Sequence, residues 1–204
     1  RAGRQGPGRC LRLFTEADFQ TRAAFDIPEL RRSDLAEALL ALHGLGIAEP
    51  GRLEWFEAPP EDALGAAEKL LSRLGALDGG RLGAIGRRMA RLPLHPRLAR
   101  LVVAGEDLEI PNLARLAAAL LETGDLVART SLDARAVPGG HGLESDLWAR
   151  LDAYQEAEAA HFSAGAIRAA GLDGAALRQA RLAFEALRNR VSQAEEPADA
   201  EERL

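Results

Sequence analysis

The sequence is poor in cysteine, and this shortage excludes two kinds of site. Cys10 is the single cysteine among 204 residues, so the chain can form neither an internal disulfide nor a cysteine-based zinc site. This composition suits a reducing compartment, and we expect a cytoplasmic protein. No apolar run approaches the roughly 18 residues that a membrane-spanning helix needs, and the start has no signal-peptide pattern. We therefore expect no membrane contact.

Lysine is nearly absent as well, since Lys69 is the only one, and arginine carries almost all of the positive charge. The formal net charge of −5 argues against a protein that binds polyanions through its bulk charge. Residues 79–105 differ, because they hold six arginines and no acidic residue. Such a patch suits contacts with nucleic-acid phosphates, although a solvated helix face or pairing with distant carboxylates is the alternative. The candidate contacts are Arg87, Arg88, Arg91, Arg97 and Arg100.

The first half of the chain has the element order of a winged helix. Residues 10–14 alternate apolar and polar and predict a strand, followed by a short helix capped by Thr15 and Asp18. Apolar residues at helical spacing predict one helix ending at Gly44 and a second over 63–74. An Asp-Gly-Gly turn at 78–80 then predicts a hairpin.

The second half is predicted to be a helical bundle. Prolines at 93 and 96 interrupt the helical pattern, and we place a domain boundary there. Apolar stripes at 98–102, 113–121, 147–154 and 177–191 each need a partner face, which a bundle provides. Residues 131–145 are rich in glycine and predict a mobile loop, and the acidic segment 194–204 is expected to be disordered.

Few side chains suggest chemistry of their own. The four histidines lie far apart without metal-ligand spacing, so we expect no metal site and interpret His43 and His95 as structural. Trp55 and Phe56 precede a Pro-Pro pair, and packing of the loop is favoured over stacking on bases. No triad or general acid–base pair is visible.

The opening segment RAGR at 1–4 resembles the second half of motif VI in DEAH-box RNA helicases, which reads Q-R-x-G-R-x-G-R. The resemblance continues in the same order and spacing to about residue 105, and from there to residue 193 only the helical pattern and a looser similarity support it. The further segments that carry it are RLFTE at 12–16, PELRRSDL at 28–35, EAPP at 57–60, LGAL at 74–77, GRRMA at 86–90 and LPLHPRLA at 92–99.

The resemblance implies a mainly α chain with four parts. Residues 1–26 would be the end of the second RecA-like helicase domain, an α/β domain, and 27–95 the winged helix. Residues 96–193 would be the ratchet-like helical bundle that helps to hold single-stranded RNA, and 194–204 the acidic tail. The implied partners are RNA, ATP and the upstream RecA-like domains of the same chain.

The resemblance also places Arg1 and Arg4 at the two arginine-finger positions, with Gly3 keeping the backbone close to the ATP phosphates. A planar guanidinium can donate two hydrogen bonds to phosphate oxygens and offset the charge that develops during phosphoryl transfer. A helical segment would place both guanidinium groups on one side.

The phosphate-cradle motif G-x-x-x-x-G-K-[ST] and the D-E-x-H motif are missing from this sequence. We therefore expect a piece of a longer enzyme: the full-length parent would use ATP with magnesium, whereas this segment alone would bind no cofactor tightly and would be catalytically incomplete.

Two other classes of function remain. A winged-helix regulator that reads duplex DNA is disfavoured, because the helix before the hairpin carries Glu61, Asp62 and Glu68 against Lys69 and Arg73. A non-catalytic adaptor that binds a protein or nucleic acid stays open.

Overall fold

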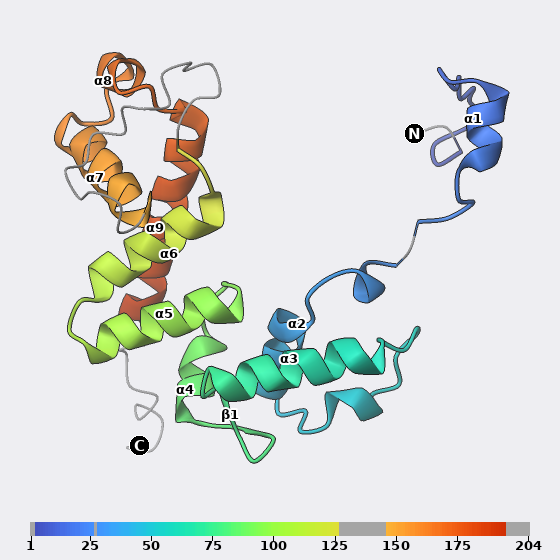
Figure 1. Cartoon of the computed structure of the whole chain (residues 1–204), viewed down its shortest axis with the longest axis horizontal. Coiled ribbons are helices and arrows are strands. Elements are labelled where there is room, and N and C mark those ends of the chain that lie inside the picture. Colours follow the sequence, from blue (N-terminus) through green and yellow to red (C-terminus); the bar gives the residue numbers. More distant parts are fainter. Residues whose placement is uncertain (1–2, 27, 127–145, 195–204) are drawn as a thin grey trace. The chain divides into compact units, whose positions relative to one another are not determined.

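The computed structural model describes residues 3–26, 28–126 and 146–194 (Figure 1). The chain divides into two compact units, Arg1–Ser33 and Asp34–Leu204, and each is described by itself. The loop predicted over 131–145 and residues 195–204 of the predicted tail lie outside the described residues. The fold is mainly α, as predicted.

The first unit contains helix α1 (Glu16–Thr21) and a 3₁₀ turn, η1 (Glu29–Arg31). The predicted cap is confirmed, because the Thr15 hydroxyl accepts a hydrogen bond from the Asp18 N–H at 3.2 Å. The strand predicted over residues 10–14 is wrong: this segment has no regular structure. A strand needs a neighbour to complete its hydrogen bonds, and the described part of this unit contains none.

Aromatic and arginine side chains pack against one another around α1. The rings of Phe14 and Phe19 stack with their centroids 6.2 Å apart. The guanidinium of Arg12 lies 3.9 Å from the Phe19 centroid, and that of Arg22 lies 4.3 Å from the Phe14 centroid. Because α1 buries no residue, these cation–π layers replace an apolar core.

The second unit begins with the predicted helix, helix, hairpin order, which is confirmed. Helix α2 (Ala36–Gly44) packs against α3 (Glu61–Arg73), and strands β1 (Leu77–Asp78) and β2 (Arg81–Leu82) form an antiparallel pair. Gly79 and Gly80 take φ values of +55° and +78°, which the tight hairpin turn requires. The buried core of this region includes Leu39, Leu40, Ala67, Leu71, Ala76, Leu77 and Met89.

The loop between α2 and α3 contains a 3₁₀ turn, η2 (Pro50–Arg52), and confirms only half of the packing prediction. Trp55 is half-buried, and its indole N–H donates to the Pro50 carbonyl at 2.9 Å. Phe56 is fully exposed, so its predicted packing is wrong. The indole has a polar N–H that the loop backbone can hold, whereas the phenyl ring has none.

Helix α4 (Ala84–Met89) follows the hairpin and approaches it very closely. A Cβ added at Gly86 would collide with the carbonyl oxygen of Ala76 and the side chain of Leu82. Glycine is therefore required here for α4 to lie against the hairpin.

The predicted bundle is formed by α5 (Pro96–Asp107), α6 (Pro111–Thr123), α7 (Asp146–Ala159), α8 (Ala164–Ala169) and α9 (Gly174–Ala194). Helix α6 packs against α5, α7 and α9 and is thus its central element (Figure 1). The short helix α8 was not expected from the apolar stripes.

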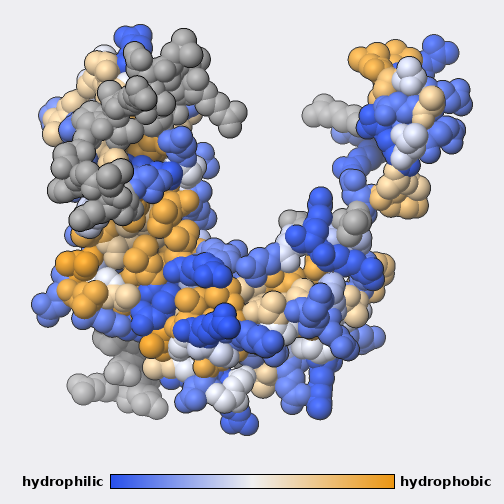
Figure 2. Space-filling view, viewed as in Figure 1, coloured by the Kyte–Doolittle hydropathy of each residue, from blue (hydrophilic) through white to orange (hydrophobic). Residues whose placement is uncertain are grey.

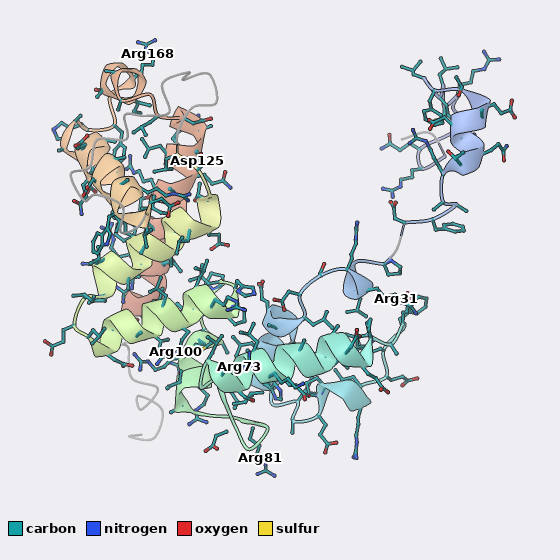
Figure 3. All side chains as sticks on the ribbon, in the orientation of Figure 1. Arg31, Arg73, Arg81, Arg100, Asp125 and Arg168 are labelled. Carbon is teal, nitrogen blue, oxygen red and sulfur yellow. The ribbon has the colours of Figure 1, made fainter. Side chains whose placement is uncertain are left out.

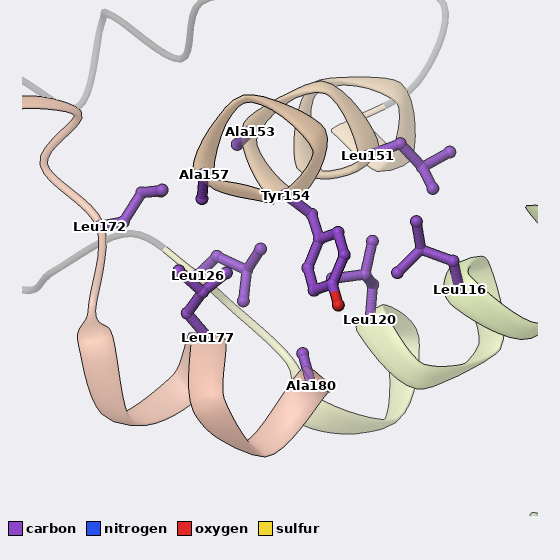
Figure 4. Close-up of a cluster of buried hydrophobic side chains, with 10 residues drawn as sticks. All are labelled: Leu116, Leu120, Leu126, Leu151, Ala153, Tyr154, Ala157, Leu172, Leu177 and Ala180. Carbon is purple, nitrogen blue, oxygen red and sulfur yellow. The ribbon is translucent and has the colours of Figure 1, made fainter. Parts of the chain in front are cut away.

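The core of the bundle gathers around Tyr154, which is 1% exposed (Figure 4). Its neighbours come from α6, α7, α9 and the segments beside them, so residues distant in sequence share one cluster. The cluster consists of Leu116, Leu120, Leu126, Leu151, Ala153, Tyr154, Ala157, Leu172, Leu177 and Ala180.

Candidate nucleotide and nucleic-acid contacts

Two of the N-terminal candidates, Gly3 and Arg4, lie in a turn. Arg1 lies outside the described residues. Gly3 has a φ of +86°, and its N–H donates to the Gly6 carbonyl at 2.9 Å, so this turn favours glycine. Arg4 is exposed and makes no ion pair within the described residues. Gly3 and Arg4, the described residues of this segment, are therefore not helical, and Arg4 is accessible.

Arg88 in the arginine patch is paired with carboxylates of α5. Its Nη1 donates to Asp107 at 2.7 Å, and its Nη2 donates to Glu106 at 2.9 Å. These hydrogen bonds, first that with Glu106 and then that with Asp107, raise the pKa of Arg88. Pairing with distant carboxylates is therefore what the structure shows at this residue.

Glu106 also binds a second arginine, which is more deeply buried. Its Oε1 lies 3.2 Å from Nη2 of Arg115 in α6, and the Arg115 residue is 7% exposed. Glu106 thus joins α4, through Arg88, to α6, and the winged helix is linked to the bundle by charge as well as by packing.

Of the other arginines of the patch, one is half-buried and the rest are exposed. Arg100 is half-buried, and its Nε donates to the Leu74 carbonyl at 3.1 Å. Arg87 is exposed, although one of its amino groups donates to the Leu82 carbonyl at 3.0 Å. Arg91 and Arg97 are exposed and form no ion pair with any described residue. Arg81, which Figure 3 shows at the hairpin, is also exposed.

The structural role predicted for His95 and His43 is confirmed. His95 caps α5, because its Nδ1 accepts the Arg97 N–H at 3.3 Å, and its Nε2 is then free to donate to Asp34 at 3.3 Å. The pKa of Asp34 is lowered, chiefly by the Ala36 N–H that donates to it and also by His95. His43 is 6% exposed, and this burial lowers its pKa.

Sequence reasoning did not single out two clefts. One of about 480 Å³ lies in the winged helix beside His43, Glu68 and Arg81. The other, of about 380 Å³, lies in the bundle. The second has a weak sequence signal, since Arg181, Phe184 and Arg188 recur at helical spacing in α9.

The described residues contain no site of two other kinds. No helix among them is long and apolar enough to cross a membrane. Within the same residues, no group of three or more His, Cys, Asp or Glu side chains is placed to hold a metal ion.

The helix, helix, hairpin order of a winged helix precedes a helical bundle, and part of the winged helix matches a family model. Residues 67–94, from the middle of α3 to just beyond α4, match the winged-helix helicase-associated domain (HA2). This part of the chain is therefore similar to the helicase-associated winged-helix domain.

A particular relative extends this assignment. The chain is 42% identical over 123 residues to the ATP-dependent RNA helicase HrpB of Escherichia coli (strain K12), a match that covers 60% of this chain and 15% of that protein. Among solved structures it is similar to the E. coli DExH-box NTPase HrpB, with 39% identity, coverage of 59% of this chain and 15% of that one, and a TM-score of 0.49. The resemblance to a helicase seen in the sequence is confirmed, and the chain spans about 15% of the length of this curated relative.

Proposed function

We propose that this chain is the C-terminal portion of an ATP-dependent RNA helicase similar to HrpB, in which it couples ATP hydrolysis to movement or unwinding of RNA. The observation that carries the proposal is the 42% identity to HrpB over 123 residues, which accompanies the helicase-associated winged helix at 67–94. Because the chain spans about 15% of that relative, the proposal needs upstream RecA-like domains of the same chain.

In this proposal the enzyme is the full-length protein, and this segment alone is catalytically incomplete. ATP with magnesium would be held mainly by the upstream domains, because the sequence of this segment has no phosphate-cradle motif. Bound magnesium would supply charge neutralisation at the phosphates. The exposed single cysteine, Cys10, is compatible with a cytoplasmic protein.

Arg1 and Arg4 would contact the ATP phosphates, with Gly3 allowing the backbone to approach. Support comes from Arg4, whose guanidinium is exposed and free of carboxylates among the described residues. A guanidinium in this state can donate two parallel hydrogen bonds to phosphate oxygens without first breaking an ion pair.

Single-stranded RNA would contact the arginine patch through only some of its members. Arg87, Arg91 and Arg97 are exposed and form no ion pair within the described residues. Arg88 is less suited because two carboxylates hold it, and Arg100 is less suited because it is half-buried. Each phosphate contact would add to the salt dependence of RNA binding.

The test is RNA-stimulated ATP turnover by the full-length protein carrying Arg4→Ala. An arginine finger contributes roughly 10³ to 10⁵ in rate, so turnover is expected to fall by orders of magnitude. Arg9→Ala is the matched control, because Arg9 is also exposed in the same segment, and it is expected to leave turnover unchanged. An Arg4→Ala enzyme as active as the control would remove the finger role, and an inactive wild-type protein that still binds a partner would favour the adaptor.

A further inference from the structure

A cleft in the helical bundle combines aromatic rings with cations. It has a volume of about 380 Å³ and opens between α7, the turn after α7, and α9. It shares no residue with the arginine patch or with the N-terminal candidates. Its walls include Tyr154, His161, Phe162, Arg181, Phe184 and Arg188.

Buried Tyr154 fixes the orientation of the two phenylalanine rings. Phe162 meets the Tyr154 ring edge-on, with centroids 5.6 Å apart and an interplanar angle of 67°. Phe184 meets it from α9 with centroids 6.3 Å apart and an angle of 79°. Because Tyr154 is anchored in the core, both phenylalanines are held in place before any ligand arrives.

The guanidinium group of one arginine of α9 lies over the ring of each phenylalanine. The guanidinium carbon of Arg181 lies 5.0 Å from the Phe162 centroid, and that of Arg188 lies 6.0 Å from the Phe184 centroid. Arg181 is also paired with Glu185 at 2.9 Å, whereas Arg188 is exposed and has no ion pair with any described residue. Guanidinium planes and aromatic rings are the two surfaces on which proteins stack nucleobases.

The charges of the cleft favour a base over a bare phosphate. Glu158 and Glu185 line it together with Arg181 and Arg188, so the cleft does not select anions by net charge. Glu158 is exposed and has no ion pair within the described part of the chain, so its carboxylate can accept a hydrogen bond from a base amino group. Arg188 remains available for a phosphate on the same nucleotide.

We propose that this cleft binds a nucleobase, stacked against the Phe162–Arg181 and Phe184–Arg188 layers, with its phosphate on Arg188. The nucleotide comes either from an RNA strand or from a free mononucleotide. The RNA source rests on the proposed function, whereas the mononucleotide source does not.

The test is a titration of the chain into a short single-stranded RNA that carries one 2-aminopurine, whose fluorescence is quenched when the base stacks. AMP and GMP, added as competitors, distinguish the two sources. Phe184→Leu keeps an apolar side chain but removes the ring, and it is expected to weaken binding about tenfold. Phe184→Trp restores a ring and is expected to restore binding.

A charge-matched pair of variants separates stacking from general attraction. Arg188→Gln is expected to weaken binding about tenfold, since it removes both the stacking plane and the phosphate contact. Arg178→Gln removes the same charge from an exposed position of the same helix outside the cleft, and it is expected to bind as wild type does. Circular dichroism of each variant shows whether it is folded. If Phe184→Leu is unfolded, the binding of Arg188→Gln tests the proposal instead.

Competition by the mononucleotides supports a site for the base itself, and quenching by RNA without competition supports a strand site. Absence of quenching with the wild-type chain overturns the proposal, as does an Arg188→Gln variant that binds like Arg178→Gln. These results are independent of the Arg4→Ala assay. If Arg4→Ala loses turnover but the wild-type chain binds no base, only the cleft proposal is rejected. If the chain binds the base but Arg4→Ala keeps its turnover, only the arginine-finger proposal is rejected.

Discussion

Glu106 is expected to be a strong single determinant of stability in the second unit. Glu106→Ala would remove the carboxylate that Arg88 and Arg115 share. Arg115 would then be buried without a carboxylate partner, and Arg88 would keep Asp107 alone. Removing one partner of a buried pair costs about 3–5 kcal/mol. The Glu106 side chain is 23% exposed and that of Arg115 is 9% exposed, so we place the loss at the lower end, about 3 kcal/mol.

The matched control is Asp107→Ala, the next residue of α5. Asp107 also pairs with Arg88, but its side chain is 50% exposed, and the expected loss is below about 1 kcal/mol. Adding Arg115→Met to Glu106→Ala should recover part of the stability, because the uncompensated charge is removed. Urea unfolding followed by circular dichroism measures all three free energies. Equal losses for the two alanine variants would refute the reasoning.

Two further predictions concern α4 and the buried histidine. Gly86→Ala should destabilise the chain by about 1–3 kcal/mol in urea unfolding, because the new Cβ meets the Ala76 carbonyl, whereas Gly65→Ala, with open space around it, should stabilise it by up to about 1 kcal/mol. Burial holds the pKa of His43 below 6.5, so its contribution to stability is complete above pH 6.5 and is lost as the pH falls below that value. His43→Leu should therefore flatten the fall in stability between about pH 7 and pH 5, and an unchanged slope would contradict this.

The helices that face the core could be predicted from the sequence, because their apolar residues recur at the helical period. The hairpin could be predicted as well, since Gly79 and Gly80 supply the backbone angles that its turn demands. These signals are local: each lies within one turn or one helix. The short helix α8 buries no residue, so it left no stripe to find.

The failures concern features that depend on distant partners. The segment at 10–14 has the alternation of a strand, but a strand also needs a neighbour. Whether Arg88 is free to bind a phosphate depends on Glu106 and Asp107, which lie close to it only because α5 packs against α4. The bundle cleft was missed for the same reason, because Tyr154 and Arg188 come from different helices that the fold brings together.

The most direct test of the central claim is strand displacement by the full-length wild-type protein on an RNA duplex with a single-stranded overhang, with and without ATP and magnesium. We expect strand displacement or RNA-stimulated ATP turnover, and either activity should require ATP with magnesium. A folded full-length protein that neither displaces strands nor hydrolyses ATP in the presence of RNA would contradict it.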